Sequence, residues 1–231
     1  MAARLLRLLI NRLVPSDPTW VVVRSGAASG LQLLIDPKQE KFYWTGTHET
    51  AVQLAIVHTL KPGMTFWDIG AHIGFFSLLA SRCVGDSGHI HAFEPLPPNR
   101  QRLLAAIDKN GSTNITVHDM ALAATHGEAL FYAHGSSLMW TLVPGRGERE
   151  GMTVPCCTLD EMAQSLPLPN LIKIDAEGAE VDILRSGTQF LAAQRPMLIV
   201  EFSNNELLLE AQTLLPSCTF ERIAARHWLM R

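Results

Sequence analysis

Four acidic residues stand at the ends of segments that read as buried strands. Asp68 follows TFW, Glu94 follows HIHAF, Asp175 follows IKI, and Glu201 follows LIV. Open parallel sheets bind ligands at the carboxyl ends of their strands, so we expect these carboxylates to converge on one crevice. Carboxylates placed there can accept hydrogen bonds from ribose hydroxyls, attract a cationic ligand or take up a proton.

A glycine-containing loop follows the first of these strands. Gly70 and Gly74 flank it before a helix begins, and glycines permit a tight turn and close approach of a ligand to the backbone. Glu94 comes twenty residues after Gly74, the distance at which an acid binds ribose hydroxyls in doubly wound folds. The arrangement predicts a nucleoside site that includes Gly70, Ala71, Gly74, Glu94 and Pro95.

The loop favours one nucleoside cofactor over another. His72 stands where a dinucleotide fingerprint would have its middle glycine. Asp68, just before the loop, would repel a pyrophosphate but suits a cation. S-adenosylmethionine carries a sulfonium and an ammonium group, so we predict it as the cofactor. An NAD-dependent oxidoreductase is the alternative, although it would need a second catalytic domain for which the chain has little room.

Strands and helices must alternate to position these residues. Apolar density and helix caps predict a parallel sheet with helices on both faces, interrupted by a hairpin at 128–133 and 152–157. A capping box at Thr50 and Gln53 should begin a helix at 49–60, and another at Thr158 and Glu161 a later one. Gly111 and Gly187 are candidate C-terminal caps. The expected strands are 20–23, 31–35, 64–69, 89–94, 114–118, 171–175 and 197–202, and the further helices are 74–83, 98–109, 158–165, 177–186 and 204–214.

Composition limits the classes of protein that fit. The chain has 231 residues, with 19 Lys and Arg against 22 Asp and Glu, which argues against an overall basic nucleic-acid-binding protein. The hydrophobic fraction of 47% suits a folded domain, and no apolar run approaches the ~20 residues of a membrane span. Four cysteines without C-x-x-C spacing indicate a reducing compartment, hence a cytoplasmic location, and no metal site is predicted.

The first residues differ in character from the rest. Residues 1–14 have a basic amphipathic pattern, which predicts either a helix packed on the domain or peripheral membrane contact. We expect an accessory region or substrate cap at 1–47, containing a helix and short strands, and the catalytic domain at 48–231.

Several motifs together resemble one family. They are PGMTFWDIGAHIGFFS at 62–77, FEP at 93–95, TLDEM at 158–162, IKIDAEGAE at 172–180 and VEF at 200–202. In order and spacing they are similar to FkbM-type, S-adenosylmethionine-dependent methyltransferases over 48–203, with His72 in place of the usual asparagine. The resemblance implies a Rossmann-like class I fold, α/β, in three α/β/α layers with a mostly parallel seven-stranded sheet ending in a hairpin near 218–231. It also implies O-methylation of a hydroxyl on a sugar, glycolipid or natural product.

The resemblance also assigns roles to residues near the cofactor. Asp68 and Gly70 would flank its methionine part, Glu94 would bind its ribose, and Glu49 matches a glutamate common in the family. Adenine would meet Asp119, Met120 or Ala121.

Other residues are candidates for the reaction and the acceptor. Asp175, near the methionine end, is the first candidate for the catalytic base, followed by His48 and His72, since histidine titrates near neutrality. Glu177, Glu201 and Trp140 are expected to contact the acceptor, a small molecule or glycan. Asp175 and Glu177 could share a cation but lack a third ligand. A non-catalytic nucleoside-binding module is a further alternative.

Overall fold

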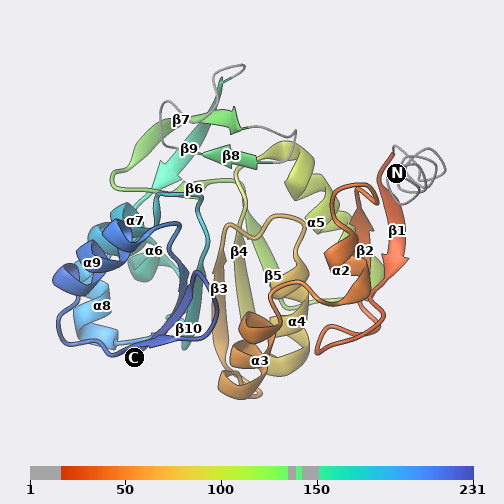
Figure 1. Cartoon of the computed structure of the whole chain (residues 1–231), viewed down its shortest axis with the longest axis horizontal. Helices are drawn as coiled ribbons and strands as arrows, with labels where there is room; N and C mark the ends of the chain where they lie inside the picture. The colour runs from red at the N-terminus through yellow and green to blue at the C-terminus, as the bar shows by residue number, and fades with distance from the viewer. Residues whose placement is uncertain (1–16, 135–138, 142–150) are drawn as a thin grey trace, which may run out of the picture.

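A seven-stranded sheet forms the centre of the protein (Figure 1). The structure is a computed structural model that describes residues 17–134, 139–141 and 151–231, so the predicted helix at 1–14 and most of the 134–151 loop lie outside the described residues. Five central strands are parallel, and β13 and β12 add an antiparallel hairpin at one edge, as predicted. The spatial order is β12 (Phe220–Arg222), β13 (His227–Met230), β11 (Met197–Glu201), β10 (Leu171–Ile174), β3 (Thr65–Ile69), β4 (His89–Phe93) and β5 (Ile115–His118).

Helices cover both faces of this sheet, which confirms the three-layer expectation. One apolar core joins Phe66 and Ile90 of the sheet to α3 (Thr50–Thr59), α4 (Phe75–Val84) and α5 (Pro97–Asn110). A second core, around Trp67 and Ile172, joins the opposite face to α6 (Leu159–Ser165), α7 (Glu180–Ser186), α8 (Thr188–Gln194) and α9 (Asn205–Leu214). Successive side chains of a strand point to opposite faces of the sheet, so each strand contributes to both apolar cores and is buried on both faces.

A smaller sheet lies over the carboxyl ends of the central strands (Figure 1). Its order is β6 (Ala121–Leu122), β9 (Gly151–Cys157), β7 (Gly127–His134) and β8 (Met139–Thr141). β7 and β9 pair antiparallel, which confirms the predicted hairpin.

The segment before the central sheet packs onto α5. β1 (Thr19–Val22) and β2 (Gln32–Ile35) form a hairpin, and α2 (Lys41–Thr45), which the sequence pattern did not indicate, follows it. Glu40 forms a buried ion pair with Arg102 of α5, whose Nε also donates to the Leu34 carbonyl. These contacts hold the segment against the helix that follows β4.

Local capping expectations had mixed outcomes. Thr158 and Glu161 form the predicted capping box, and Gly111 ends α5 in the left-handed region. The box predicted at Thr50 and Gln53 is wrong: Glu49 is the N-cap residue and makes no side-chain cap. Gln53 donates instead to the carbonyls of Gly46 and His48, so it orders the preceding loop. Gly187 follows α7 with φ −118° and leads directly into α8.

Gly74 is required by packing, because a Cβ added there would lie 2.3 Å from Cδ1 of Leu103. Its φ of +87° adds backbone strain for any other residue. We expect Gly74→Ala to reduce the free energy of unfolding by about 2–4 kcal/mol, measured by urea denaturation. Gly111→Ala is the matched control, since its φ is +65° but nothing lies within 4 Å; an equal loss in both variants would contradict the packing argument.

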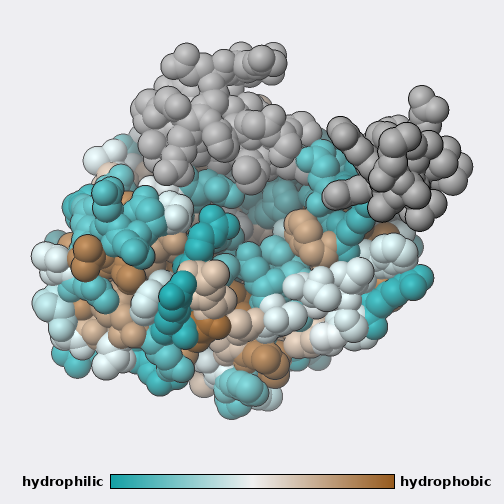
Figure 2. Space-filling view, viewed as in Figure 1, coloured by the Kyte–Doolittle hydropathy of each residue, from teal (hydrophilic) through white to brown (hydrophobic). Residues whose placement is uncertain are grey.

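The outer surface has a mixed character. Figure 2 shows hydrophobic side chains in small groups among hydrophilic ones on the face in view, as is usual for a globular protein. Among the described residues, no helix has the length and apolar character needed to cross a membrane.

Candidate active site

A pocket of about 420 Å³ opens at the carboxyl ends of β3, β4, β10 and β11. The small sheet contributes Phe131 and Leu122 to its wall, and the segment around α2 contributes Phe42 and Tyr43. Three of the four strand-end acids, Glu94, Asp175 and Glu201, converge on this pocket as expected, and Asp68 does not reach it. The predicted site residues that line the pocket are His48, Glu49, Gly70, Ala71, His72, Glu94, Pro95, Ala121, Asp175, Glu177 and Glu201.

Asp68 and Gly74 lie behind the pocket wall. Asp68 is completely buried, and its Oδ2 accepts a hydrogen bond of 2.6 Å from Ser77. Gly74 begins α4 against Leu103, so close packing rather than ligand approach explains it. Gly70 does line the pocket, and a Cβ there would lie 1.9 Å from the Asp175 carbonyl oxygen, so the ends of β3 and β10 approach closely only with glycine.

Lys173 is a buried cation that the sequence analysis missed. It is 2% exposed, and its Nζ lies 3.8 Å from Asp68 and 3.2 Å from Asp175. Burial lowers the pKa of Lys173, but these carboxylates outweigh burial and raise it. A lysine in an otherwise apolar strand was the available signal, because a buried ammonium needs carboxylate partners.

Glu94 is positioned by the backbone of its surroundings. Its two carboxylate oxygens accept hydrogen bonds from the N–H groups of His72 and Leu96, at 2.8 and 2.9 Å. Burial raises the pKa of Glu94 to about 7. Asn99 Nδ2 also donates to Oε1, at 3.5 Å, whereas Oε2 can accept a further hydrogen bond, so Glu94 remains able to bind a ribose hydroxyl.

His72 connects the glycine loop to the preceding segment. Its Nδ1 lies 3.2 Å from the Tyr43 hydroxyl, and its Nε2 lies 3.8 Å from the Glu40 carboxylate. Burial, together with Arg102, lowers the pKa of His72 to about 3. The imidazole is therefore neutral at physiological pH and a weak base.

His48 also lines the pocket and lies among aromatic rings. Its ring centroid is 4.9 Å from Phe42 and 4.4 Å from Tyr43. Burial lowers its pKa to about 4. The expectation that histidine would titrate near neutrality is thus wrong for both His48 and His72, because neither ring is solvated enough to protonate easily.

A group of charged residues occupies the end of the pocket beyond Asp175. His227 Nε2 lies 3.2 Å from Glu49 and 3.7 Å from Glu201. Arg226, whose side chain is 60% exposed, lies 2.6 Å from Glu201 and supplies positive charge at the rim. Sequence reasoning missed Arg226 and His227, since neither belongs to a recognisable motif.

Asp175 and Glu201 lie close enough together that the ionisation of each carboxyl group affects the pKa of the other. Burial opposes ionisation of Asp175, but Lys173 outweighs it and lowers the pKa of Asp175. Burial and the Asp175 charge raise the pKa of Glu201 to about 8, against the opposing effect of Arg226. This pair is therefore better matched to proton transfer near neutrality than either histidine.

Of the three residues predicted to contact adenine, one lines the pocket. Ala121 lines the pocket beside Leu122, whereas Asp119 is exposed and, like Met120, does not line it. Glu177 stands exposed at the rim with φ +50°. The side chain of Trp140 lies outside the described residues.

The comparisons with known proteins decide the family. The model of the methyltransferase FkbM domain matches residues 68–222. The chain belongs to the FkbM methyltransferase family. The matched model is that of a methyltransferase domain, so the family to which the chain belongs is one of methyltransferases. A curated relative, the hexuronic acid methyltransferase AglP of Haloferax volcanii, is 30% identical over 133 residues, 54% of this chain; the chain spans about half the length of that relative.

Solved structures support the class I methyltransferase fold. The FkbM methyltransferase of Methylobacillus flagellatus KT superposes with a TM-score of 0.53 at 17% identity, over 82% of this chain and 51% of that one. A precorrin-6y C5,15-methyltransferase of Geobacter metallireducens GS-15 has a TM-score of 0.50 at 15% identity, over 79% and 87%. At these identities the likeness concerns the fold alone.

The pocket of this FkbM methyltransferase suits S-adenosylmethionine. Glu94 offers lone pairs to ribose hydroxyls, and Ala121 and Leu122 offer an apolar surface to an adenine ring. The two carboxylates of Asp68 and Asp175 outnumber the single Lys173 ammonium between them, and Asp175 lines the pocket. Negative charge there suits a sulfonium and an ammonium group.

Proposed function

We propose that this protein transfers the methyl group of S-adenosylmethionine to a hydroxyl group of an acidic sugar. The interacting pair of Asp175 and Glu201 in the pocket wall carries this proposal, because it supplies a proton acceptor beside the proposed cofactor site. The curated relative acts, by its name, on a hexuronic acid, which supports a sugar acceptor.

The pair would act as the general base. S-adenosylmethionine supplies an activated methyl group, so the protein's main task is to align the acceptor oxygen with it. A hydroxyl must also lose its proton, which the Asp175–Glu201 pair takes up. Lys173 holds Asp175 in place from beneath, at 3.2 Å. His227 and Glu49 limit the freedom of Glu201 from the other side.

Arg226 would recognise the acid group of the sugar. Its exposed guanidinium stands at the pocket rim, where it can exchange part of its contact with Glu201 for a sugar carboxylate. Planar guanidinium groups bind carboxylates through paired hydrogen bonds. A neutral sugar would lack this contact.

The test is methyl transfer to a uronic acid glycoside and to its neutral counterpart, followed by mass spectrometry. We expect an alkali-stable methyl ether on the uronic acid glycoside. An alkali-labile methyl ester would show that the carboxyl group is the acceptor and would contradict the hydroxyl proposal. Failure to methylate either glycoside while S-adenosylmethionine binds would count against a sugar acceptor.

Changing Arg226 should alter acceptor affinity more than turnover. For Arg226→Gln we expect KM for the uronic acid glycoside to rise about tenfold, the equivalent of roughly 1.4 kcal/mol, with a smaller change in kcat. Arg222→Gln is the control, because Arg222 is exposed on β12 and does not line the pocket. Equal KM values for Arg226→Gln and the parent protein would show that Arg226 does not bind the acceptor carboxylate.

Glu94 should control cofactor affinity. For Glu94→Ala we expect the Kd of S-adenosylmethionine to rise tenfold or more in calorimetric titration, about 1.4 kcal/mol, because the ribose acceptor is lost. Glu128→Ala is the control, an exposed glutamate on β7. Unchanged affinity in Glu94→Ala would place the ribose elsewhere.

A further inference from the structure

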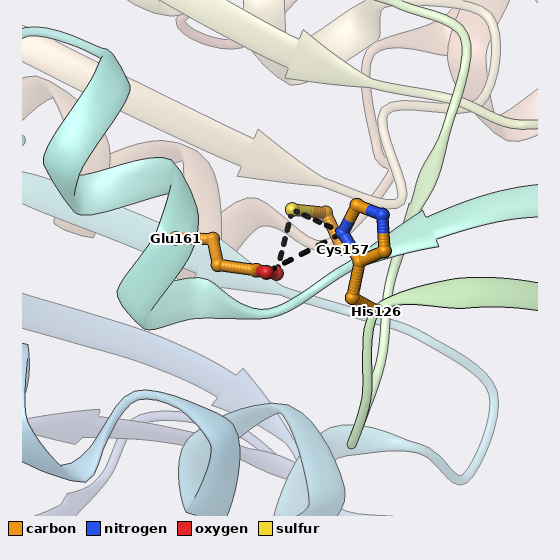
Figure 3. Close-up of side chains that lie close together, drawn as sticks. All are labelled: His126, Cys157 and Glu161. Carbon is orange, nitrogen blue, oxygen red and sulfur yellow. Dashed lines mark hydrogen bonds and ion pairs between the residues drawn. The ribbon is translucent and has the colours of Figure 1, made fainter.

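A second group of reactive side chains lies outside the pocket, where the small sheet meets α6 (Figure 3). His126 precedes β7, Cys157 ends β9, and Glu161 belongs to the first turn of α6. Figure 3 shows the three side chains pointing toward one another from these separate elements. The methyl-transfer chemistry described above uses none of them.

The separations between their polar atoms are those of a metal tripod. Cys157 Sγ lies 3.0 Å from Glu161 Oε2 and 3.9 Å from His126 Nδ1, and His126 Nδ1 lies 3.4 Å from Glu161 Oε1. Ligands of a tetrahedral zinc ion, at bond lengths of about 2.0–2.3 Å, are about 3.3–3.6 Å apart. Small rotations of the side chains would therefore bring all three atoms into coordination distance of one ion.

The surroundings already orient two of the three ligands. Glu161 Oε2 accepts hydrogen bonds from the Thr158 backbone N–H and hydroxyl, both at 2.9 Å, which fixes the carboxylate and leaves Oε1 facing His126. Hydrogen bonds of this kind to a ligating carboxylate are typical of metal sites. Cys157 is 6% exposed and held in the second apolar core.

The third ligand gives access from solvent. The His126 side chain is 72% exposed and that of Glu161 42%, so an ion can reach the buried thiol from the open side. The nitrogen, sulfur and oxygen donor set suits Zn²⁺, which accepts all three, better than Mg²⁺ or Ca²⁺, which prefer oxygen alone.

We propose that His126, Cys157 and Glu161 bind one Zn²⁺ ion, with water completing a tetrahedral site. The Cys157 thiol, which donates to Glu161 in the metal-free protein, forms the Zn–S bond and releases its proton to solvent. The ion ties β9 and α6 to the turn before β7. Since β9 pairs with β6, which lines the cofactor pocket, the ion braces one wall of that pocket.

Co²⁺ is the probe, because a thiolate ligand gives it a charge-transfer absorption band. We expect the full-length protein to bind one Co²⁺ with this band and to exchange it for Zn²⁺ on titration. Cys157→Ser should lose the band, and His126→Gln should weaken Zn²⁺ at least tenfold in chelator competition. Cys83→Ser and His58→Gln are the matched controls, a partly exposed cysteine and an exposed histidine away from the cluster.

Absence of the thiolate band in the parent protein, or its survival in Cys157→Ser, would overturn the proposal. His126→Gln guards against misfolding, since it changes only an exposed side chain, and unchanged Zn²⁺ affinity in it would also overturn the site. Binding of S-adenosylmethionine, measured in the same samples, distinguishes failure of the zinc site from failure of the methyltransferase.

Discussion

Lys173→Met is expected to destabilise the protein by about 3–5 kcal/mol, because it leaves two buried carboxylates without their shared cation. Asp68 is completely buried, and Asp175 has only a partly exposed side chain. Lys173 also lies over the Phe76 ring, at 5.1 Å, so methionine would keep the packing and remove the charge. Urea denaturation at pH 7 measures the loss.

The loss should become smaller as pH falls. Without Lys173 the pKa of Asp68, which burial already raises, would rise further in the folded protein. The native state would then bind more protons than the unfolded state, so the stability of the variant would increase on acidification. Lys41→Met, an exposed lysine of α2, should change stability by less than about 0.5 kcal/mol. If Lys173→Met is as stable as this control, the carboxylates of Asp68 and Asp175 do not depend on Lys173, and the prediction is wrong.

Asp175→Asn should lower kcat by about 10²–10⁴-fold, the usual contribution of a general base. Asparagine preserves the shape of the side chain but cannot take the proton of a hydroxyl. Binding of S-adenosylmethionine should persist within a few-fold, since Gly70, Ala71 and Glu94 remain. Asp182→Asn, at an exposed position of α7, is the control. Parallel losses of kcat and cofactor affinity would assign Asp175 to binding instead.

The pH profile provides an independent check on the same pair. In the parent protein we expect kcat/KM to rise with pH through an inflection near 8, because the pair must be deprotonated to act as a base and burial with Asp175 raises the pKa of Glu201 to about 8. Arg226, His227 and Glu49 also face Glu201. In Asp175→Asn the inflection of the residual activity should fall, since the Asp175 charge is gone. A flat profile from pH 6 to 9 would exclude this base.

The central fold was predictable because its apolar strand pattern, its alternation of strands and helices and its helix caps all indicate the same parallel sheet. The apolar strands ending in Asp68, Glu94 and Asp175 could be buried only in a parallel sheet, and the alternation of helices fixed its two covered faces. The Thr158–Glu161 box was recognisable because both partners are local in sequence. These features depend on residues only a few positions apart.

Other features depend on contacts that no local pattern contains. Gln53 has the spacing of a capping residue but bonds to carbonyls of the preceding loop. Burial lowers the pKa values of His48 and His72, and Tyr43 of α2, a helix of only five residues, contacts both rings. Arg226 and His227 reach the pocket only through the antiparallel pairing of β13 with β11.

The pocket is lined by residues from inside and from outside the stretch that matches the family. Its cofactor side comes from the strand ends within 68–222, the stretch that defines the family. Residues 39–49 on one side and Arg226 on the other lie outside that stretch, yet they face the same hollow. The pocket is therefore built from the family stretch together with residues on both of its sequence flanks. Chimaeras that exchange only these flanking stretches between family members offer a direct route to new acceptor specificities.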